Sequence, residues 1–180
     1  GSLCVADYNN HRIRKVAPDG TVSTFAGSGV AGGVDGQGTA AQFNAPFALA
    51  VDGQDNVFVA DYFNHAIRRI TPGGQVSTFF GSMPLPGFQD GAAAAARFST
   101  CLGLVPDGAG GLFVADWTNH AIRRVASDGS VTTLAGSPNV QGWRPGPLPG
   151  SLHMPQGLVR SPAGDLVLLT SSGLVQITAP

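Results

Sequence analysis

Glutamate is absent from this 180-residue chain, and lysine occurs once, at Lys15. All 11 acidic residues are therefore aspartates, so acid–base catalysis by a pair of glutamates is excluded. The Gly-rich phosphate loop that closes on Lys-Ser or Lys-Thr is absent as well. No run of 18 apolar residues occurs, so no membrane span is predicted.

Cysteine and charge are also scarce. The two cysteines, Cys4 and Cys101, are too few for a disulfide framework. The net charge is −1, which argues against a general phosphate-backbone binder, because such proteins carry a basic excess on one face. What the chain does have is 43% hydrophobic residues and 26 glycines, a composition that favours an ordered, turn-rich fold.

The sequence repeats itself about every 55 residues. Val5-Ala6-Asp7-Tyr8 returns as Val59-Ala60-Asp61-Tyr62 and as Val114-Ala115-Asp116-Trp117. Each copy continues with Asn-His, one variable residue, and then Ile-Arg. A period of this length indicates an array of one supersecondary unit.

The central copy reads as four short strands. Apolar runs at 46–51, 57–60, 65–70 and 76–80 are separated by turn residues such as Asp52-Gly53 and Pro72-Gly73. No segment between them is long enough for the helix that a parallel crossover needs, so we expect an antiparallel meander. Several runs are apolar on both faces, as in a sheet stacked between neighbours, and radial repetition of such sheets is a β-propeller.

The segments between the units also resemble each other. Asp35-Gly36 and Asp90-Gly91 are each followed by alanines and then by Phe43 or Phe98. We expect an Asp-Gly turn, one helical turn over the alanines, and a Phe that anchors the return into the next unit. The third such segment, 137–152, has lost this pattern.

The Val-Ala-Asp-aromatic-x-Asn-His-x-Ile-Arg segment, the Asp-Gly-x-Val-Ser/Thr-Thr strand and the Asp-Gly linker together resemble the NHL repeat family of β-propellers. The resemblance covers most of residues 3–136 and implies an all-β propeller of four-stranded antiparallel blades. Residues 153–180 resemble the family more loosely, because Leu169-Thr170-Ser171-Ser172 stands where Asp and Asn-His are expected.

The copies predict two complete and two partial blades. The complete blades are 43–81 and 98–136. The partial blades are 1–27, which lacks a first strand, and 153–180, whose sequence is degenerate. The linkers between blades are 28–42, 82–97 and 137–152. The resemblance to this family implies a ring of six blades, so we expect either another protein or further blades of the same protein to close the ring. A self-closed four-bladed ring is the minor alternative.

The repeated polar residues invite a catalytic or metal-binding interpretation, since His and Asp are metal ligands. Residues that recur in every blade are first blade-building residues, however, and we expect Asp to cap the turn while Asn and His bond the adjacent backbone. No catalytic residue, metal or cofactor is therefore predicted. These blade-structural positions are Asp7, Asp61, Asp116, Asn10, Asn64, Asn119, His11, His65 and His120.

The non-repeating loops are the remaining candidates for function. Aromatic and Arg residues are enriched at interface hot spots, and loops carry function on rigid scaffolds. The candidate partner-binding residues are Met83, Leu85, Phe88, Trp143 and Arg144, although Phe88 and Trp143 equally fit a role in pinning their own loops.

We therefore expect a non-enzymatic protein–protein interaction scaffold. The first alternative is a fragment of a propeller enzyme of the lyase or lactonase kind, for which His153 is the one non-repeated histidine. The weaker alternative is an RNA-binding platform, for which the basic pairs Arg14/Lys15, Arg68/Arg69 and Arg123/Arg124 would have to form an exposed basic stripe. We expect them instead to pack along their stems and pair with Asp.

Overall fold

Four small antiparallel sheets make up the computed structural model, which describes residues 1–81, 83, 85–138, 140, 142 and 150–178. The first and last sheets have three strands each, paired in chain order. Their strands are β1 (Leu3–Asp7), β2 (Arg12–Val16), β3 (Val22–Ala26), β14 (Gly157–Arg160), β15 (Leu166–Thr170) and β16 (Gly173–Ile177).

The two central sheets have four long strands and one short fifth strand each. The second sheet has the order β5-β6-β7-β8-β4 and the third has β10-β11-β12-β13-β9. Their strands are β4 (Gly36–Gln37), β5 (Pro46–Val51), β6 (Val57–Asp61), β7 (Ala66–Ile70), β8 (Gln75–Phe80), β9 (Gly91–Ala92), β10 (Cys101–Pro106), β11 (Leu112–Asp116), β12 (Ala121–Val125) and β13 (Ser130–Gly136).

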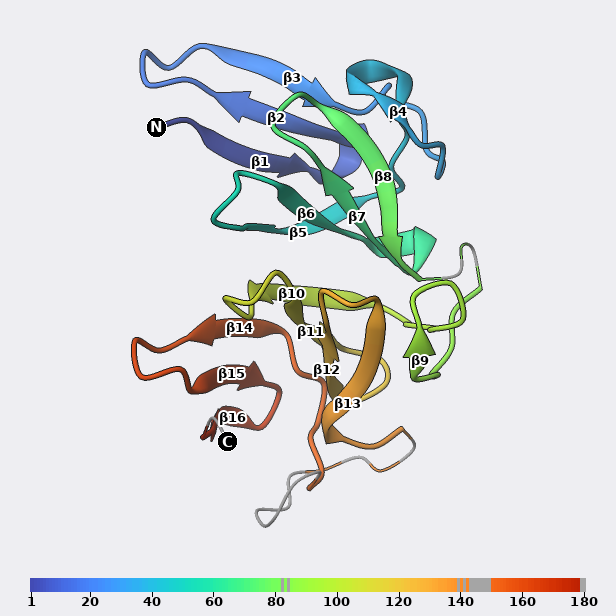
Figure 1. The fold of residues 1–180 in the computed structure, drawn as a ribbon, viewed down its shortest axis with the longest axis vertical. Helices are drawn as coiled ribbons and strands as arrows, with labels where there is room; N and C mark the ends of the chain where they lie inside the picture. The colour runs from blue at the N-terminus through green and yellow to red at the C-terminus, as the bar shows by residue number, and fades with distance from the viewer. Residues whose placement is uncertain (82, 84, 139, 141, 143–149, 179–180) are drawn as a thin grey trace.

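The sheets follow one another as the blades of a propeller, from the blue N-terminal sheet at the top of Figure 1 to the red C-terminal sheet at its lower left. Neighbouring blades touch through their inner strands, β1 against β5, β5 against β10 and β10 against β14. The predicted fold class, an all-β propeller with two complete and two partial blades, is confirmed.

The linkers do more than connect blades. In the first linker β4 pairs with β8, and in the second β9 pairs with β13, so each linker adds a strand to the outer edge of the blade that follows it. The expected helical turn is present in the first linker as a 3-10 helix, η2 (Gly38–Ala40). The sequence did not predict these added strands, because two-residue pairings leave no periodic signal.

The hydrophobic core is divided into three clusters, one between each pair of neighbouring blades. Between blades 1 and 2, Ile13 and Ala26 face Val59 and Val76, and Phe43 from the linker completes the cluster. The second cluster repeats this arrangement with Phe98 in the place of Phe43. Blades are therefore held together mainly by burial of their own faces, with one aromatic anchor from each acidic linker.

Both cysteines are free, Cys4 half-buried and Cys101 buried. Among the described residues, the structure contains no helix with the length and apolarity needed to cross a membrane.

Each of the first three blades ends at a glycine that side-chain-bearing residues cannot replace. Gly81 follows β8 with φ +104°, and a Cβ placed there would lie 2.7 Å from the backbone oxygen of His65. We expect Gly81→Ala to lower the free energy of unfolding by about 1–3 kcal/mol, measured by urea denaturation. Gly53→Ala is the matched control, because a Cβ there meets nothing within 4 Å. Equal effects of the two changes would contradict this assignment.

Candidate functional site

The repeated Asp-aromatic-x-Asn-His segment forms the same turn in blades 1 and 2. In blade 2, Asp61 ends β6, the 3-10 helix η3 (Tyr62–Asn64) follows, and His65 takes a left-handed conformation with φ 52°. In blade 1, η1 (Tyr8–Asn10) has the same place and His11 the same φ. The turn reverses the chain within a few residues and presents its second residue, an aromatic, outward.

A buried guanidinium lies at the centre of blade 2. Arg68 on β7 donates from Nη1 to Asp61 Oδ2 at 2.9 Å and from Nη2 to Asp35 Oδ1 at 2.6 Å. Asp61 belongs to the same blade, whereas Asp35 comes from the preceding linker. Arg68 also donates to the linker carbonyls of Val34 and Gln42, and its side chain has no exposed area. Arg68 thus donates three hydrogen bonds to the linker, and the Asn64 amide donates another to the Gly32 carbonyl oxygen.

Blade 3 repeats this ion-pair network. Arg123 on β12 pairs with Asp116 of its own blade and with Asp90 of the linker. Its guanidinium carbon also lies 4.4 Å from the centre of the Phe88 ring, so that ring covers the buried charge. The prediction that the Arg residues pair with Asp is confirmed for Arg68, Arg123 and Arg124, the last through Asp107.

Burial raises the pKa values of the aspartates Asp61 and Asp116 in these pairs. Desolvation raises the pKa of Asp116 to about 6, against the Asn119 amide, the Ser99 N–H and the Arg123 guanidinium, which all favour the ionised form. Burial also raises the pKa of Asp61. Asp116 is still ionised at neutral pH, because about 6 lies below 7. A raised carboxyl pKa at a buried ion pair fits structural use, and perturbed values alone do not mark catalysis.

The expected role of the aspartates as turn caps is wrong. Asp7 and Asp61 precede the 3-10 helices without any side-chain capping bond. Asp61 instead accepts from the Asn44 backbone N–H and from the Asn64 amide. For Asp61 the physical reason is that the buried Arg68 is a stronger partner than the turn's own N–H groups, whereas Asp7 accepts from the Asn10 amide across the turn.

The histidines bond backbone, as expected, but it is the backbone of the next blade. His11 Nδ1 accepts from the Ala45 N–H at 3.0 Å, and His120 Nδ1 accepts from the Met154 N–H at 3.1 Å. His65 Nδ1 lies 2.9 Å from the Ser99 carbonyl oxygen. Each histidine therefore fastens its blade to the strand entrance of its successor. Within the described residues no three His, Cys or Asp side chains are grouped so as to hold a metal ion.

Blade 4 lacks the whole network. Thr170 replaces the aspartate, Val175 replaces the arginine, and the turn is two residues shorter. The Thr170 hydroxyl donates to the Gly173 carbonyl to close the turn instead. Ser171 Oγ lies 2.9 Å from His153 Nδ1, and the His153 ring lies 5.5 Å from that of His120.

An aromatic cluster joins the turns η1 and η3 of blades 1 and 2 to β5, with Tyr8 and Tyr62 half-buried and the two phenylalanines exposed. It consists of Tyr8, Phe47, Tyr62 and Phe63, with ring centres 4.7–6.1 Å apart and mostly edge-to-face contacts. Phe47 is 49% exposed and Phe63 52% exposed. Sequence reasoning missed this cluster. The signal was there in the aromatic that follows Asp in three copies, but Phe47 joins it only through the pairing of β5 with β6.

The predicted partner-binding loop residues have different surroundings. Phe88 lies over Arg123, and Met83 packs against Gly33, where a Cβ would meet its sulfur at 3.0 Å. Phe88 and Gly33 hold the same position in successive linkers, so Met83 lies beside the residue that is equivalent to Phe88. Leu85 is 51% exposed. Trp143 and Arg144 lie outside the described residues, and the binding role of all five stays a prediction.

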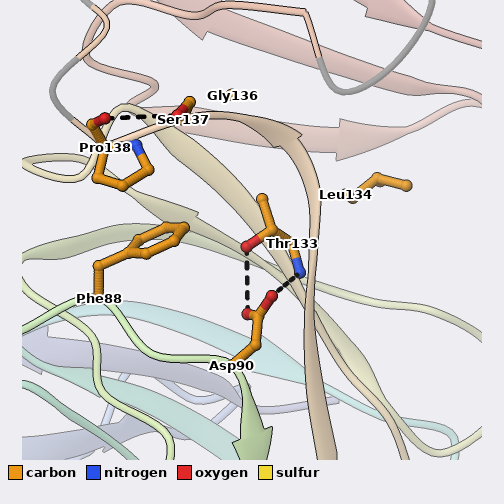
Figure 2. Close-up of a pocket in the computed structure, with 7 residues that line it drawn as sticks. All are labelled: Phe88, Asp90, Thr133, Leu134, Gly136, Ser137 and Pro138. Carbon is orange, nitrogen blue, oxygen red and sulfur yellow. Dashed lines mark hydrogen bonds between the residues drawn. The ribbon is translucent and has the colours of Figure 1, made fainter.

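Phe88 also borders a shallow hollow of ≈ 560 Å³ at the outer edge of blade 3, shown in Figure 2. Asp90 accepts from both the backbone N–H and the hydroxyl of Thr133 there, while the Phe88 ring faces the hollow from the linker side. The carboxylate that lines the hollow is thus fully used by the blade. We interpret the hollow as a seam between linker and β13.

The buried network gives a direct stability prediction. Asp61→Asn should lower the free energy of unfolding by about 3 kcal/mol, because it leaves Arg68 buried with one carboxylate fewer. Asp7→Asn in blade 1 is the matched control and should cost under about 1 kcal/mol, since among the described residues the Asp7 carboxylate bonds only Asn10. Urea denaturation of both variants tests this, and a loss for Asp7→Asn as large as that for Asp61→Asn would refute it.

The junction of blades 3 and 4 should respond to pH. Burial, and then the nearby His153, lower the pKa of His120 from its ordinary 6.5, so the unfolded chain binds the proton more readily. The contribution of His120 is therefore complete above pH 6.5 and is lost as pH falls through its folded pKa. Asp116 has the opposite effect on stability. Between its folded pKa of about 6 and its ordinary pKa of 3.8 the folded chain binds the proton more readily, so a falling pH stabilises the fold.

We expect the unfolding free energy of the wild type to fall relative to that of His120→Asn as the pH drops from about 7.5 to 6, because the variant lacks the His120 part of the slope of unfolding free energy against pH. Urea titrations at several pH values measure it. His153→Asn should reduce the slope in part, because it removes the neighbouring ring. An unchanged slope in His120→Asn would show that another group is responsible.

Comparison with known proteins places the fold. No protein-family model matches the chain. Protein SUPPRESSOR OF QUENCHING 1, chloroplastic, from Arabidopsis thaliana is 41% identical over 71 residues, which are 39% of this chain and 7% of that protein. The match covers too little of either protein to show a common family.

Solved structures resemble the chain over nearly its whole length. A Bacteroides thetaiotaomicron protein of unknown function has a TM-score of 0.79 at 23% identity, covering 97% of this chain and 43% of its own. An auxiliary nutrient binding protein from the same organism scores 0.73 at 16% identity, covering 93% and 42%. Virginiamycin B lyase from Staphylococcus aureus scores 0.61 at 16% identity, covering 99% and 52%.

The chain thus spans about half the length, or less, of the structures it resembles. Identities this low show the fold alone, and the proteins that share it include a binder and a lyase. The chain is a β-propeller.

Proposed function

We propose that this chain is an NHL-like propeller platform that binds another protein through the aromatic cluster of Tyr8, Phe47, Tyr62 and Phe63. The observation that carries the proposal is a cluster of four contacting rings, of which Phe47 and Phe63 are about half exposed and Tyr8 and Tyr62 are half-buried. Aromatic side chains bring large contact area at low entropic cost, and they dominate interface hot spots.

The cluster is held in place before any partner arrives. Tyr8 and Tyr62 begin the turns η1 and η3, and the Phe63 N–H donates to the Asn44 carbonyl oxygen. Phe47 lies on β5, which is paired on one side and packed against β1 and β10. Little ordering entropy remains to be lost on binding, which favours affinity.

The chemistry of the patch also indicates the kind of partner. No charged side chain belongs to the cluster, and the exposed neighbours Asn9 and Asn10 are neutral amides. A partner segment with aliphatic, aromatic or proline side chains and little charge fits such a surface. The near-neutral net charge of −1 gives no long-range steering for a strongly charged partner.

The alternatives receive less support. An enzyme of the lyase or lactonase kind has the His153–Ser171 pair to offer, but the Ser171 hydroxyl also donates to the His153 carbonyl oxygen, as a turn-closing group does. An RNA platform needs an exposed basic stripe, and Arg68 and Arg123 have no exposed side-chain area.

Site-specific photocrosslinking in the whole native protein tests the proposal. With p-benzoylphenylalanine in place of Phe63, we expect one defined protein to be captured in the cells of origin. Phe47→Ser should reduce that product about tenfold or more, because hot-spot truncation costs at least about 2 kcal/mol. The matched control places the same crosslinker at Val159, which is 60% exposed but far from the cluster in sequence. Capture from position 85 but not from position 63 would move the interface to the linker loop.

A further inference from the structure

One face of the first blade is exposed although its residue types are those of a core. Val5 is 45% exposed, whereas its equivalents Val59 and Val114 have no exposed area. Val22 is 55% exposed, against 0% for Val76 and 1% for Val131. Leu3 shows the same contrast at 68%. The same positions of the repeat are thus buried in blades 2 and 3 and open in blade 1.

The structure itself shows what covers this face elsewhere. Val59 and Val76 are packed by Ile13 and Ala26 of the preceding blade and by Phe43 of the preceding linker. In the next blade, Val114 and Val131 are covered in the same way by Ile67, Phe80 and Phe98. A blade face together with one linker Phe is therefore the regular occupant of this surface.

The charges on blade 1 point to the same occupant. Arg14 holds the place of Arg68, yet within the described residues its guanidinium has a single hydrogen-bond partner, Thr24 Oγ1 at 2.7 Å. In blade 2, Asp35 Oδ1 accepts from both Arg68 and Thr78, the equivalent of Thr24. In blade 3, Asp90 bonds Arg123 and Thr133 in the same way. Blade 1 has the two donors without the bridging carboxylate.

These groups border one hollow of ≈ 470 Å³, lined by Val5, Asp7, Arg14, Val16 and Val22 among others. It combines a cationic group with an apolar wall, which is the chemistry that an Asp-Gly linker ending in Phe satisfies in blades 2 and 3. Asp7 lines the same hollow, and it is the blade-1 equivalent of Asp61, the second carboxylate that binds Arg68 in blade 2.

We propose that the exposed face of the β1–β3 sheet is the docking site for another blade of the same repeat and its acidic linker, from the same polypeptide. The linker Asp bridges Arg14 and Thr24, and the linker Phe packs between Arg14 and the valines. A second copy of this chain fits less well, because Asp35 and Asp90 are already paired and linker 137–152 contains no acidic residue. The proposal is argued from Arg14, Thr24 and the valines and not from the aromatic cluster, although Tyr8 of that cluster also lines the hollow.

The repeat allows an exact test. Because Asp7 and Asp61 are 54 residues apart, a copy of residues 1–54 placed before residue 1 continues the pattern in register. In this extended chain we expect amide hydrogen exchange in β1 and β3 to slow markedly. Arg14→Gln should lower its Tm by about 10 °C, but by only about 2 °C or less in the 180-residue chain.

Lys15→Gln is the matched control, since Lys15 neighbours Arg14 on the same strand and should have little effect in either chain. Changing the copied Asp35 to Asn should cost as much as Arg14→Gln, and the two changes together should cost no more than one. Equal Tm losses for Arg14→Gln in both chains, or unchanged exchange in β1 and β3, would overturn the proposal.

A second measurement tests the docking site without the extended chain, and it applies even if that chain does not fold. A peptide of residues 32–43, titrated into the 180-residue chain, should shift NMR signals of β1–β3 saturably, and its Asp35→Asn version should not. No saturable shift, or equal shifts with both peptides, would count against the docking site. Dimerisation of the 180-residue chain that Arg14→Gln abolishes would show a second copy as the occupant and overturn our choice.

Discussion

In each central blade, one buried guanidinium lies between two carboxylates that reach it from different segments. Arg68 joins Asp61, on its own blade, to Asp35, on the linker 33 residues earlier. Burying such charges is costly, and the cost is offset only because both carboxylates and two linker carbonyls complete the coordination of the guanidinium. The position of the linker depends on this arrangement together with the Asn64 bond to the Gly32 carbonyl oxygen and the pairing of β4 with β8.

The fourth blade supports this interpretation, because the network is lost there as a set. Thr170 and Val175 replace the aspartate and the arginine together, and the preceding linker carries no acidic residue. Removing only one partner would have left an uncompensated charge in the core, whereas removing all of them leaves an apolar blade with a hydroxyl-closed turn. The Arg, the Asp and the acidic linker therefore behave as one structural unit.

Much of this could be predicted from the sequence, since strand positions follow from apolar runs between Gly, Pro and Asp turns. The pairing of Arg with Asp was predictable in kind, but not the identity of the linker partner, because Asp35 meets Arg68 only after the linker folds back over its blade. The hydrogen bond from the Ala45 N–H to His11 could not be predicted for the same reason. Such contacts depend on the angle between blades, and the repeat pattern does not contain that angle.

The aromatic cluster shows how a variable surface arises on a fold whose repeated residues stabilise the blades. The residue after the repeated aspartate is Tyr8, Tyr62, Trp117 and finally Ser171 across the four blades. That position is free to vary because the turn needs only its backbone, while Asp, Asn and His around it are bound to their partners. Tyr8 and Tyr62, at this free position in blades 1 and 2, contact each other, and Phe47 contacts both. The variable surface residue and the stabilising residues are thus neighbours in one turn, so the surface can change without loss of the fold.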